Sequence, residues 1–272
     1  MNELKEIERS IIKKYRKDIY SKFIKACKDY NLVNDKDHIM VCISGGKDSF
    51  LLAKCLEELQ KHSKIKFKLS YVCMNPGYKE EVVESIMNNA KKLNINLDMF
   101  KTNIFDVAMQ CDKGICYLCA RMRRGHLYNY AKKLGCNKIA LGHHFDDVIE
   151  TTLLSMFYGS EVKTMLPKLK SQNFLGLELI RPLYYVKEEA IISFKKYNNL
   201  EFINCSCIMT DENTNLDSKR LEIKNIIKLL KEKNKSIPDH IFKSIDNINL
   251  DCCLGYKKDG IYKSFLDNFK NN

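Results

Sequence analysis

The feature that most constrains the fold is a short apolar run, HIMVCIS (residues 38–44), which is followed directly by two glycines. An amphipathic stretch with helical spacing then runs from Asp48 to His62. A buried strand, a glycine turn and a helix in this order are typical of the first unit of a parallel α/β sheet. The sequence therefore predicts that the central sheet begins at this run.

The same alternation of strand and helix continues along the chain. Further strands are expected at 66–73, 97–101, 137–142 and 177–185, and helices at 79–93 and 145–158. Alternating elements imply right-handed crossovers and an α/β fold with a doubly wound, mostly parallel sheet. The first thirty residues have helical spacing, and Lys-rich helices are expected from about residue 200 to the end. We therefore expect an N-terminal helical segment (1–36), a central α/β domain (37–200) and a helical C-terminal extension (201–272).

The charge balance favours a polyanionic partner. Lysine and arginine number 46 against 34 acidic residues, which gives a net charge of +12. Nucleic acid is the first candidate and a membrane surface the second, whereas a generally lysine-rich surface is the plain alternative. The sequence contains no apolar run of the length that crosses a bilayer, and the charged start MNELKEIERS lacks the apolar part of a secretory signal. A cytoplasmic protein without membrane contact is expected, so its 12 cysteines are core residues, ligands or nucleophiles rather than structural disulfides.

The turn after the first strand has the composition of a phosphate-binding loop, and its residues are Ser44, Gly45, Gly46, Lys47, Asp48 and Ser49. Glycines let the backbone approach a phosphate closely, and the N-terminus of the following helix attracts an anion. The spacing differs from that of a Walker A loop. Asp48 would repel phosphates unless both share a Mg²⁺ ion, and the alternative is that it caps the helix.

A second polar segment, GHHFDD, follows the strand expected at 137–142 and contains His143, His144, Asp146 and Asp147. In open α/β sheets ligands bind at the carboxyl ends of the strands, where these side chains are expected. Neighbouring acids suit metal binding or proton transfer, and histidine suits phosphate contact or acid–base work. The alternative is that one of the acids caps the helix that follows.

The cysteines select among chemistries. Cys116 and Cys119 form a Cys-x-x-Cys, which we place in a loop, and Cys205-Ser-Cys207 follows much later. The pair is compatible with a redox dithiol, half of a zinc site or part of an iron–sulfur site. The helix behind it is basic and suits contacts to an RNA backbone, with a solvated helix face as the alternative. Its arginines are Arg121, Arg123 and Arg124.

These motifs resemble those of a known family. SGGKDS is similar to the loop of the PP-loop (N-type) ATP pyrophosphatases, and GHHxDD to a segment shared by their tRNA-modifying branch, in lysidine synthetases and 2-thiocytidine synthetases alike. CYLCARMRRGHLY (116–128), with MFYG, PKL and IRPL in the same order, resembles the tRNA 2-thiocytidine synthetase family. The resemblance runs from roughly residue 15 to residue 215 and implies an ATP-binding domain of this type at 37–200.

The resemblance implies a reaction and its cofactors. ATP, with Mg²⁺, would adenylate the C2 oxygen of an anticodon-loop cytidine, at position 32 in tRNA numbering, and sulfur would replace that oxygen. The resemblance also implies a [4Fe-4S] cluster that is bound by three cysteines, Cys116, Cys119 and Cys205, with one iron free for sulfide. These cysteines and Asp48 would be the catalytic residues. The apolar run FIN before it favours Cys205 over Cys207 as the third ligand, and zinc on both is the alternative. A sulfur donor such as a cysteine desulfurase is implied, and a homodimer is compatible.

Other functions stay open at this point. A lysidine synthetase-like ligase uses the same ATP chemistry but needs no cluster, so Cys116 and Cys119 argue against it. An RNA-binding protein with a relic nucleotide site is disfavoured by the complete SGGKDS loop. Thiolation of another tRNA nucleoside is a third alternative, because Cys-x-Cys departs from the Cys-x-x-Cys of the family.

Overall fold

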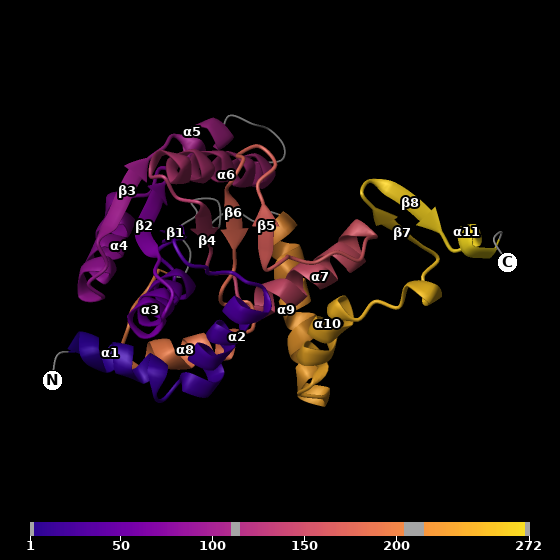
Figure 1. The fold of residues 1–272 in the computed structure, drawn as a ribbon, viewed down its shortest axis with the longest axis horizontal. Coiled ribbons are helices and arrows are strands. Elements are labelled where there is room, and N and C mark those ends of the chain that lie inside the picture. Colours follow the sequence, from indigo (N-terminus) through magenta and orange to yellow (C-terminus); the bar gives the residue numbers. More distant parts are fainter. Residues whose placement is uncertain (1–2, 110–114, 204–214, 270–272) are drawn as a thin grey trace.

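A computed structural model describes residues 3–109, 115–203 and 215–269 of the chain. Its centre is a six-stranded sheet in the order β3-β2-β1-β4-β6-β5, flanked by helices (Figure 1). The strands are β1 (His38–Cys42), β2 (Lys68–Asn75), β3 (Leu97–Lys101), β4 (Lys138–Ala140), β5 (Lys168–Lys170) and β6 (Glu178–Ile180). All neighbours pair in parallel except β5 and β6. The prediction of a doubly wound, mostly parallel sheet is therefore confirmed.

The middle of the central strand is apolar and buried on both faces of the sheet. Side chains alternate between the faces of a strand. Ile39 and Val41 of β1 accordingly pack into one hydrophobic cluster, while Met40 packs into the other. The first cluster also takes residues from α3 (Lys47–His62), α4 (Glu80–Lys92) and α8 (Glu188–Tyr197), and the second takes residues from α6 (Ile115–Lys133).

The strand order creates a crevice beside β1. Its neighbours are β2 on one side and β4 on the other, so the connections that leave β1 and β4 turn in opposite directions. Ligands of open α/β sheets bind at the carboxyl ends of the strands at such a reversal. The phosphate-loop motif follows β1, and GHHFDD begins two residues after β4.

The N-terminal helices belong to the main core. They are α1 (Glu3–Ile12), the π-helix η1 (Arg16–Tyr20) and α2 (Ser21–Asp29). Ile7, Ile11 and Ile19 are buried in the same cluster as β1 and α3. The predicted helical segment is thus part of the wall that covers one face of the sheet.

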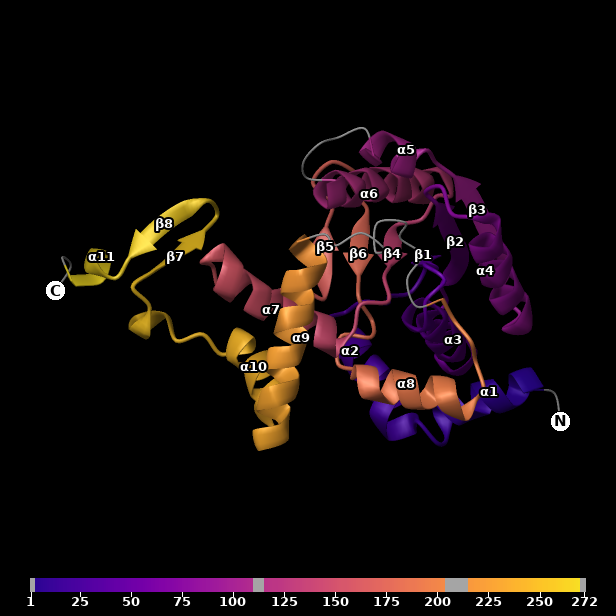
Figure 2. The same ribbon diagram turned by 180° about the vertical axis from the view of Figure 1, so that it is seen from behind.

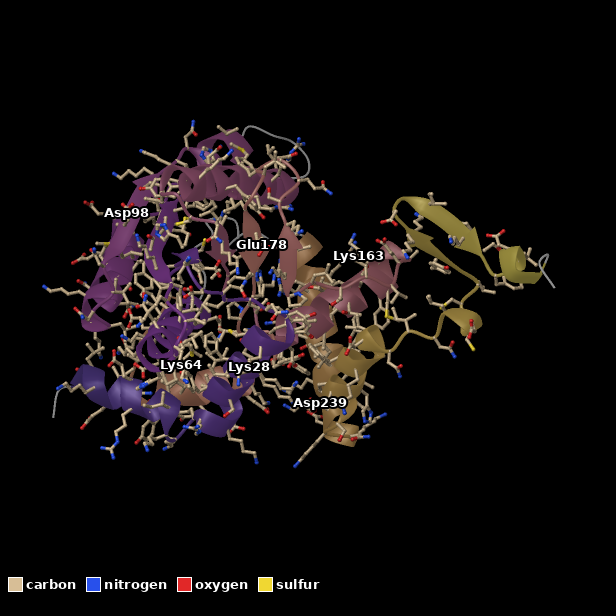
Figure 3. The ribbon with its side chains drawn as sticks, viewed as in Figure 1. Lys28, Lys64, Asp98, Lys163, Glu178 and Asp239 are labelled. Atoms are coloured by element: carbon tan, nitrogen blue, oxygen red, sulfur yellow. The ribbon has the colours of Figure 1, made fainter. Side chains whose placement is uncertain are left out.

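The C-terminal extension lies beside α7 (Phe145–Gly159) and begins with α9 (Asn215–Lys233) and α10 (Ile237–Asp246), as both views show (Figures 1 and 2). Phe242 of α10 stacks on Phe145, with ring centroids 4.8 Å apart. Asp239, labelled in Figure 3, pairs with Lys187 just before α8 (2.8 Å). These two helices therefore pack on the sheet domain.

Three local features differ from the predictions. Residues 255–264 form a hairpin, β7 (Gly255–Lys258) and β8 (Ile261–Ser264), between the short helices η3 (Leu250–Cys252) and α11 (Leu266–Phe269), instead of continuing as helix. The edge strand β5 was not predicted, because three residues carry no usable period. The Cys-x-x-Cys lies in the first turns of α6 and not in a loop, and α5 (Ile104–Met109) precedes it. Among the described residues, none of the helices has the length and apolar character that a membrane crossing requires.

Candidate functional site

The phosphate loop is folded by its own serines. The Ser49 hydroxyl accepts the Ser44 N–H (3.2 Å) and donates to the Gly46 carbonyl (2.9 Å). Gly45 has a φ of +88°, a conformation that side chains disfavour, and a Cβ there would lie 2.8 Å from Ile86. Gly46 is the N-cap of α3, and this residue has no side chain that could make a capping hydrogen bond. The first amides of α3 are therefore available to an anion, which the positive end of the helix also attracts.

The segment after β4 is pressed against the start of α3. A Cβ on Gly142 would lie 3.0 Å from the Ser49 nitrogen and 3.1 Å from the Asp48 carbonyl carbon. Glycine suits this approach, because a Cβ would crowd backbone atoms that have little freedom to move. The contact brings the histidines and acids of GHHFDD beside the phosphate loop.

A buried histidine links two carboxylates at this junction. His144 is 5% exposed, and its Nε2 lies 3.5 Å from Asp147 Oδ2 and 3.9 Å from Asp48 Oδ1. Asp48 Oδ1 is buried without a hydrogen-bond partner among the described residues. Burial raises the pKa of Asp48, and the charges of His144 and Lys47 offset this only in part. For Asp147 burial acts in the same direction, but His144, His143 and Arg220 outweigh it, and the pKa is lowered.

The orphaned Asp48 oxygen fits a cation shared with a bound phosphate. Within the described ranges, three ligating side chains are nowhere close enough together to hold a metal ion unaided. Mg²⁺ typically takes one or two protein carboxylates, waters and substrate phosphates. Asp48 beside the open α3 amides supplies the protein part of such a site.

Two of the expected ATP-site residues are held by α8. Lys47 donates to Glu188 Oε1 (2.9 Å) and lies 3.4 Å from Asp48 Oδ2. Asp146 accepts the Glu188 N–H (2.7 Å), so its carboxylate fixes the start of α8. Asp147 accepts the His144 N–H (2.9 Å) at the start of α7, which agrees with the capping alternative. The structure thus gathers Ser44–Ser49, His143, His144 and Asp147 closely, with Asp146 turned to α8.

A cavity of about 590 Å³ opens above these residues. The ends of β1, β2, β4 and β6 line one side, and Arg123, Arg124, Leu127 and Tyr128 of α6 line another. His143 lines it too, and burial lowers the pKa of this imidazole to about 4. His143 is therefore neutral at pH 7 and offers a hydrogen bond without a charge.

The structure describes some of the residues that were predicted to contact RNA or to bind a cluster. Arg123 and Arg124 line the cavity, whereas Arg121 does not and is exposed. Cys119 is half-buried, and the next residue, Ala120, lines the cavity. Cys116 belongs to α6, but its side chain, like Cys205 and Cys207, lies outside the described residues.

The last described residues before Cys205, Phe202 and Ile203, lie beside α3 and the phosphate loop. Phe202 stacks on Phe50 of α3, with centroids 5.3 Å apart. Ile203 Cδ1 would lie 3.4 Å from a Cβ on Gly45. The segment that carries Cys205 and Cys207 therefore leaves the described structure beside the loop.

Sequence reasoning missed three residues of the site. Arg220 of α9 donates from Nη2 to Asp147 Oδ1 (2.5 Å) and from Nε to Glu150 Oε2 (2.8 Å). Arg181, in the IRPL segment, lines the cavity and is 7% exposed. Glu150, one helical turn after Asp147, had a detectable signal in its spacing, whereas Arg220 had none.

Comparisons with known proteins agree with this geometry. The PP-loop domain family matches residues 15–228. The tRNA-cytidine(32) 2-sulfurtransferase of Geotalea uraniireducens is 34% identical over 227 residues, which cover 82% of this chain and 88% of that protein. The protein of the same name from Photobacterium profundum is 38% identical over 233 residues, 82% of this chain and 74% of its own.

A solved structure shares the fold. It is the U34-tRNA thiolase NcsA from Methanococcus maripaludis with its [4Fe-4S] cluster, at 20% identity and a TM-score of 0.64, covering 86% of this chain and 80% of that one. The family match and the relatives together extend over most of the chain. The chain therefore belongs to the PP-loop family, in the branch of the tRNA-cytidine(32) 2-sulfurtransferases.

Proposed function

We propose that this protein uses ATP to adenylate the C2 oxygen of cytidine 32 in a tRNA anticodon loop and then replaces that oxygen with sulfur. The observation that carries the proposal is Asp48 Oδ1, which lacks a hydrogen-bond partner among the described residues, beside the start of α3. Both lie in one cavity with a helix that begins at a Cys-x-x-Cys. The names of the relatives supply the base and its position.

The ATP step uses the loop between β1 and α3. The α3 amides, Ser44 and Ser49 bind the β- and γ-phosphates, and Asp48 shares Mg²⁺ with them. The C2 oxygen of the base attacks the α-phosphorus, the bond to the bridging oxygen breaks, and pyrophosphate leaves. We assign His143 and His144 as contacts of the phosphate oxygens, and Asp147, 3.5 Å from His144 Nε2, orients His144. Asp146 and Lys47 keep α8 against the loop.

The sulfur step uses the cysteines. We assign Cys116 and Cys119 as two ligands of a [4Fe-4S] cluster and Cys205, in preference to Cys207, as the third. Cysteine thiolates are the usual ligands of such clusters, most often four, so a set of three would leave one iron without a cysteine. In support, Ala120 lines the cavity next to Cys119, and Ile203 lies beside Gly45. A cluster held by these cysteines would supply iron that can bind sulfide.

Sulfide replaces the adenylated oxygen at C2, and that oxygen leaves with AMP. A cysteine desulfurase in the cytoplasm is the proposed source of the sulfur. The homodimer stays a prediction. The organisation of the chain into segments 1–36, 37–200 and 201–272 also stays a prediction. Arg121, Arg123 and Arg124 are the proposed contacts of α6 with tRNA.

The first test is anaerobic purification followed by an absorption spectrum and iron and sulfide analysis. Wild type is expected to be brown and to hold about four irons per chain. Cys116→Ala should lose them, whereas Cys252→Ala, at an exposed cysteine of η3, should keep them. Comparing Cys205→Ala with Cys207→Ala identifies the third ligand. A colourless protein with zinc or without metal would contradict thiolation and favour lysidine-type ligation.

The second test follows the tRNA. Pyrophosphate release should require both ATP and tRNA, and nucleoside analysis of the product should find 2-thiocytidine. A thiolated nucleoside other than cytidine would keep the chemistry but correct the substrate. Tight tRNA binding without pyrophosphate release would favour an RNA-binding protein with a relic site.

A further inference from the structure

Part of the cavity wall is lined by three arginines that the ATP chemistry above does not use. Arg123 and Arg124 come from α6, and Arg181 directly follows β6. β6 is two strands away from β1, about 10 Å across the sheet. Arg181 is therefore set apart from the loop that binds the β- and γ-phosphates, and Arg124 is close enough to act on its charge. Arg123 lies further along the wall, with its guanidinium 5.5 Å from the Phe105 ring.

Arg181 is buried with hydrogen-bonding capacity left over. It is 7% exposed, its Nη1 donates to the Leu166 carbonyl, and its Nε has no partner among the described residues. Arg123 Nε is likewise buried without a partner in the described part of the chain. Burying an unpaired N–H of a charged group is costly, so such a group usually has a ligand or a counter-ion.

Carboxylates do not supply that counter-ion. Across residues 3–109, 115–203 and 215–269, the three arginines form no ion pair within 4.0 Å. The acids that line the cavity are Asp48 and Asp147, and Asp147 is engaged by Arg220 and His144. Burial lowers the pKa of Arg181 to about 10, as expected for a guanidinium that lacks a full counter-charge. Arginine binds phosphate oxygens through two parallel hydrogen bonds, so a phosphate matches this wall.

We propose that Arg181, with Arg124, forms a second phosphate site in the cavity, for a phosphate other than the β- and γ-phosphates of ATP. The inference rests on the proposed function for the identity of its ligand. That ligand is either the α-phosphate of the nucleotide or a backbone phosphate beside the target base. Both present the same phosphate oxygens, and separate probes distinguish them.

The test measures binding without turnover, using AMP and unmodified tRNA as separate probes on the full-length protein. Arg181→Lys and Arg124→Gln are compared with wild type and with Arg16→Gln, an exposed arginine of η1. We expect the Kd of one probe to rise by about tenfold or more in both cavity variants and to stay unchanged in the control. A change for AMP identifies the α-phosphate, and a change for tRNA identifies the backbone phosphate.

The variants also separate binding from folding. Arg181→Lys keeps the buried charge but loses the planar fork, and circular dichroism and thermal unfolding check its structure. If it does not fold, Arg124→Gln decides, because Arg124 is exposed and its loss leaves the core intact. Kd values within about twofold of wild type for both probes would overturn the proposal, as would a wild type that binds neither.

The outcome is independent of the proposed function. A wild type that binds AMP through Arg181 but releases no pyrophosphate with tRNA would refute thiolation and keep the phosphate site. Normal turnover in both arginine variants, with unchanged Kd values, would refute the phosphate site and keep the proposed thiolation.

Discussion

At the scale of single residues, the site holds a charge that the fold alone does not favour. Burial raises the pKa of Asp48, against the partial compensation by His144 and Lys47, so the ionised carboxylate is less favourable in the folded than in the unfolded protein. Its Oδ1 also lacks a hydrogen-bond partner within the described residues. Such a group is retained when the binding of a ligand offsets its unfavourable burial. Here that ligand is the cation shared with ATP.

Asp48→Asn should therefore separate stability from activity. The variant loses the charge that binds Mg²⁺, and tRNA-dependent pyrophosphate release should fall by about a hundredfold or more. Its melting temperature without ligand should equal or exceed that of wild type, because a buried charge is removed. Thermal unfolding with and without Mg²⁺ and ATP measures both effects. A variant that melts well below wild type without ligand would show that Asp48 has a structural role instead.

His143 gives a pH dependence with a defined sign. Burial lowers its pKa to about 4, whereas an unfolded histidine titrates near 6.5. Between these values the unfolded chain binds a proton that the folded chain does not, so stability falls as the pH falls through this window. The slope from this residue is up to about 1.4 kcal/mol per pH unit. Urea unfolding at pH 7 and pH 5 should show a smaller loss in His143→Gln than in wild type, and an equal loss would contradict the assignment.

Two glycines offer a matched pair. A Cβ on Gly142 would meet backbone atoms of Asp48 and Ser49 at 3.0–3.2 Å, whereas one on Gly125, within α6, meets nothing within 4 Å. Gly142→Ala should displace the GHHFDD segment from the loop and lower pyrophosphate release by about tenfold or more. Gly125→Ala should raise the free energy of unfolding by about 0.5–1 kcal/mol. Steady-state assays and urea unfolding check the pair, and full activity in Gly142→Ala would refute the close contact.

At the scale of elements, the site is closed by two helices that are not part of the first strand–helix unit. α6 forms one wall of the cavity and begins at the Cys-x-x-Cys, and α9 reaches the acids of α7 through Arg220. Arg220 and Asp147 are 73 residues apart, so no local pattern predicts their contact. The start of α6 was predicted as a loop, although Ile115, Leu118 and Met122 recur there at helical spacing.

Arg220 should matter to both stability and catalysis. Arg220→Gln leaves Glu150, which is 3% exposed, and Asp147 without their main cation. The free energy of unfolding should fall by about 1–3 kcal/mol, and pyrophosphate release should fall because Asp147 no longer holds His144 in place. Urea unfolding and the release assay measure both, with Lys228→Gln on the exposed side of α9 as the control. Equal effects of the two substitutions would contradict the role.

At the scale of the whole molecule, the sheet and the phosphate loop were predictable from the sequence, because their signals are local. β1 is apolar on both faces, its glycines and Asp48 follow at once, and GHHFDD follows β4 at the same edge of the sheet. Arg181 was not predictable as a cavity residue, because a buried arginine has no mark in sequence that separates it from a surface one. The same holds for the C-terminal hairpin, whose strands have four residues each.

The C-terminal extension divides into a part that packs on the domain and a part that does not. α10 stacks Phe242 on Phe145 and pairs Asp239 with Lys187. The strands β7 and β8 pair with each other, and the hairpin stands away from the sheet in both views (Figures 1 and 2). Its larger apolar side chains are exposed, with Ile261 at 65% and Tyr262 at 60%. The family match also ends before it, at residue 228.

Truncation after Asn247 should therefore leave the folded domain intact. An isolated two-stranded hairpin contributes little stability of its own, so the melting temperature should stay within about 2 °C of wild type. Pyrophosphate release should also be unchanged. The matched control is truncation after residue 214, which removes α9 and α10 and with them Arg220 and Phe242. It should abolish release and lower the melting temperature strongly. If the shorter truncation alone destroyed activity, the hairpin would have to contact the substrate, and its lysines would become the next residues to replace.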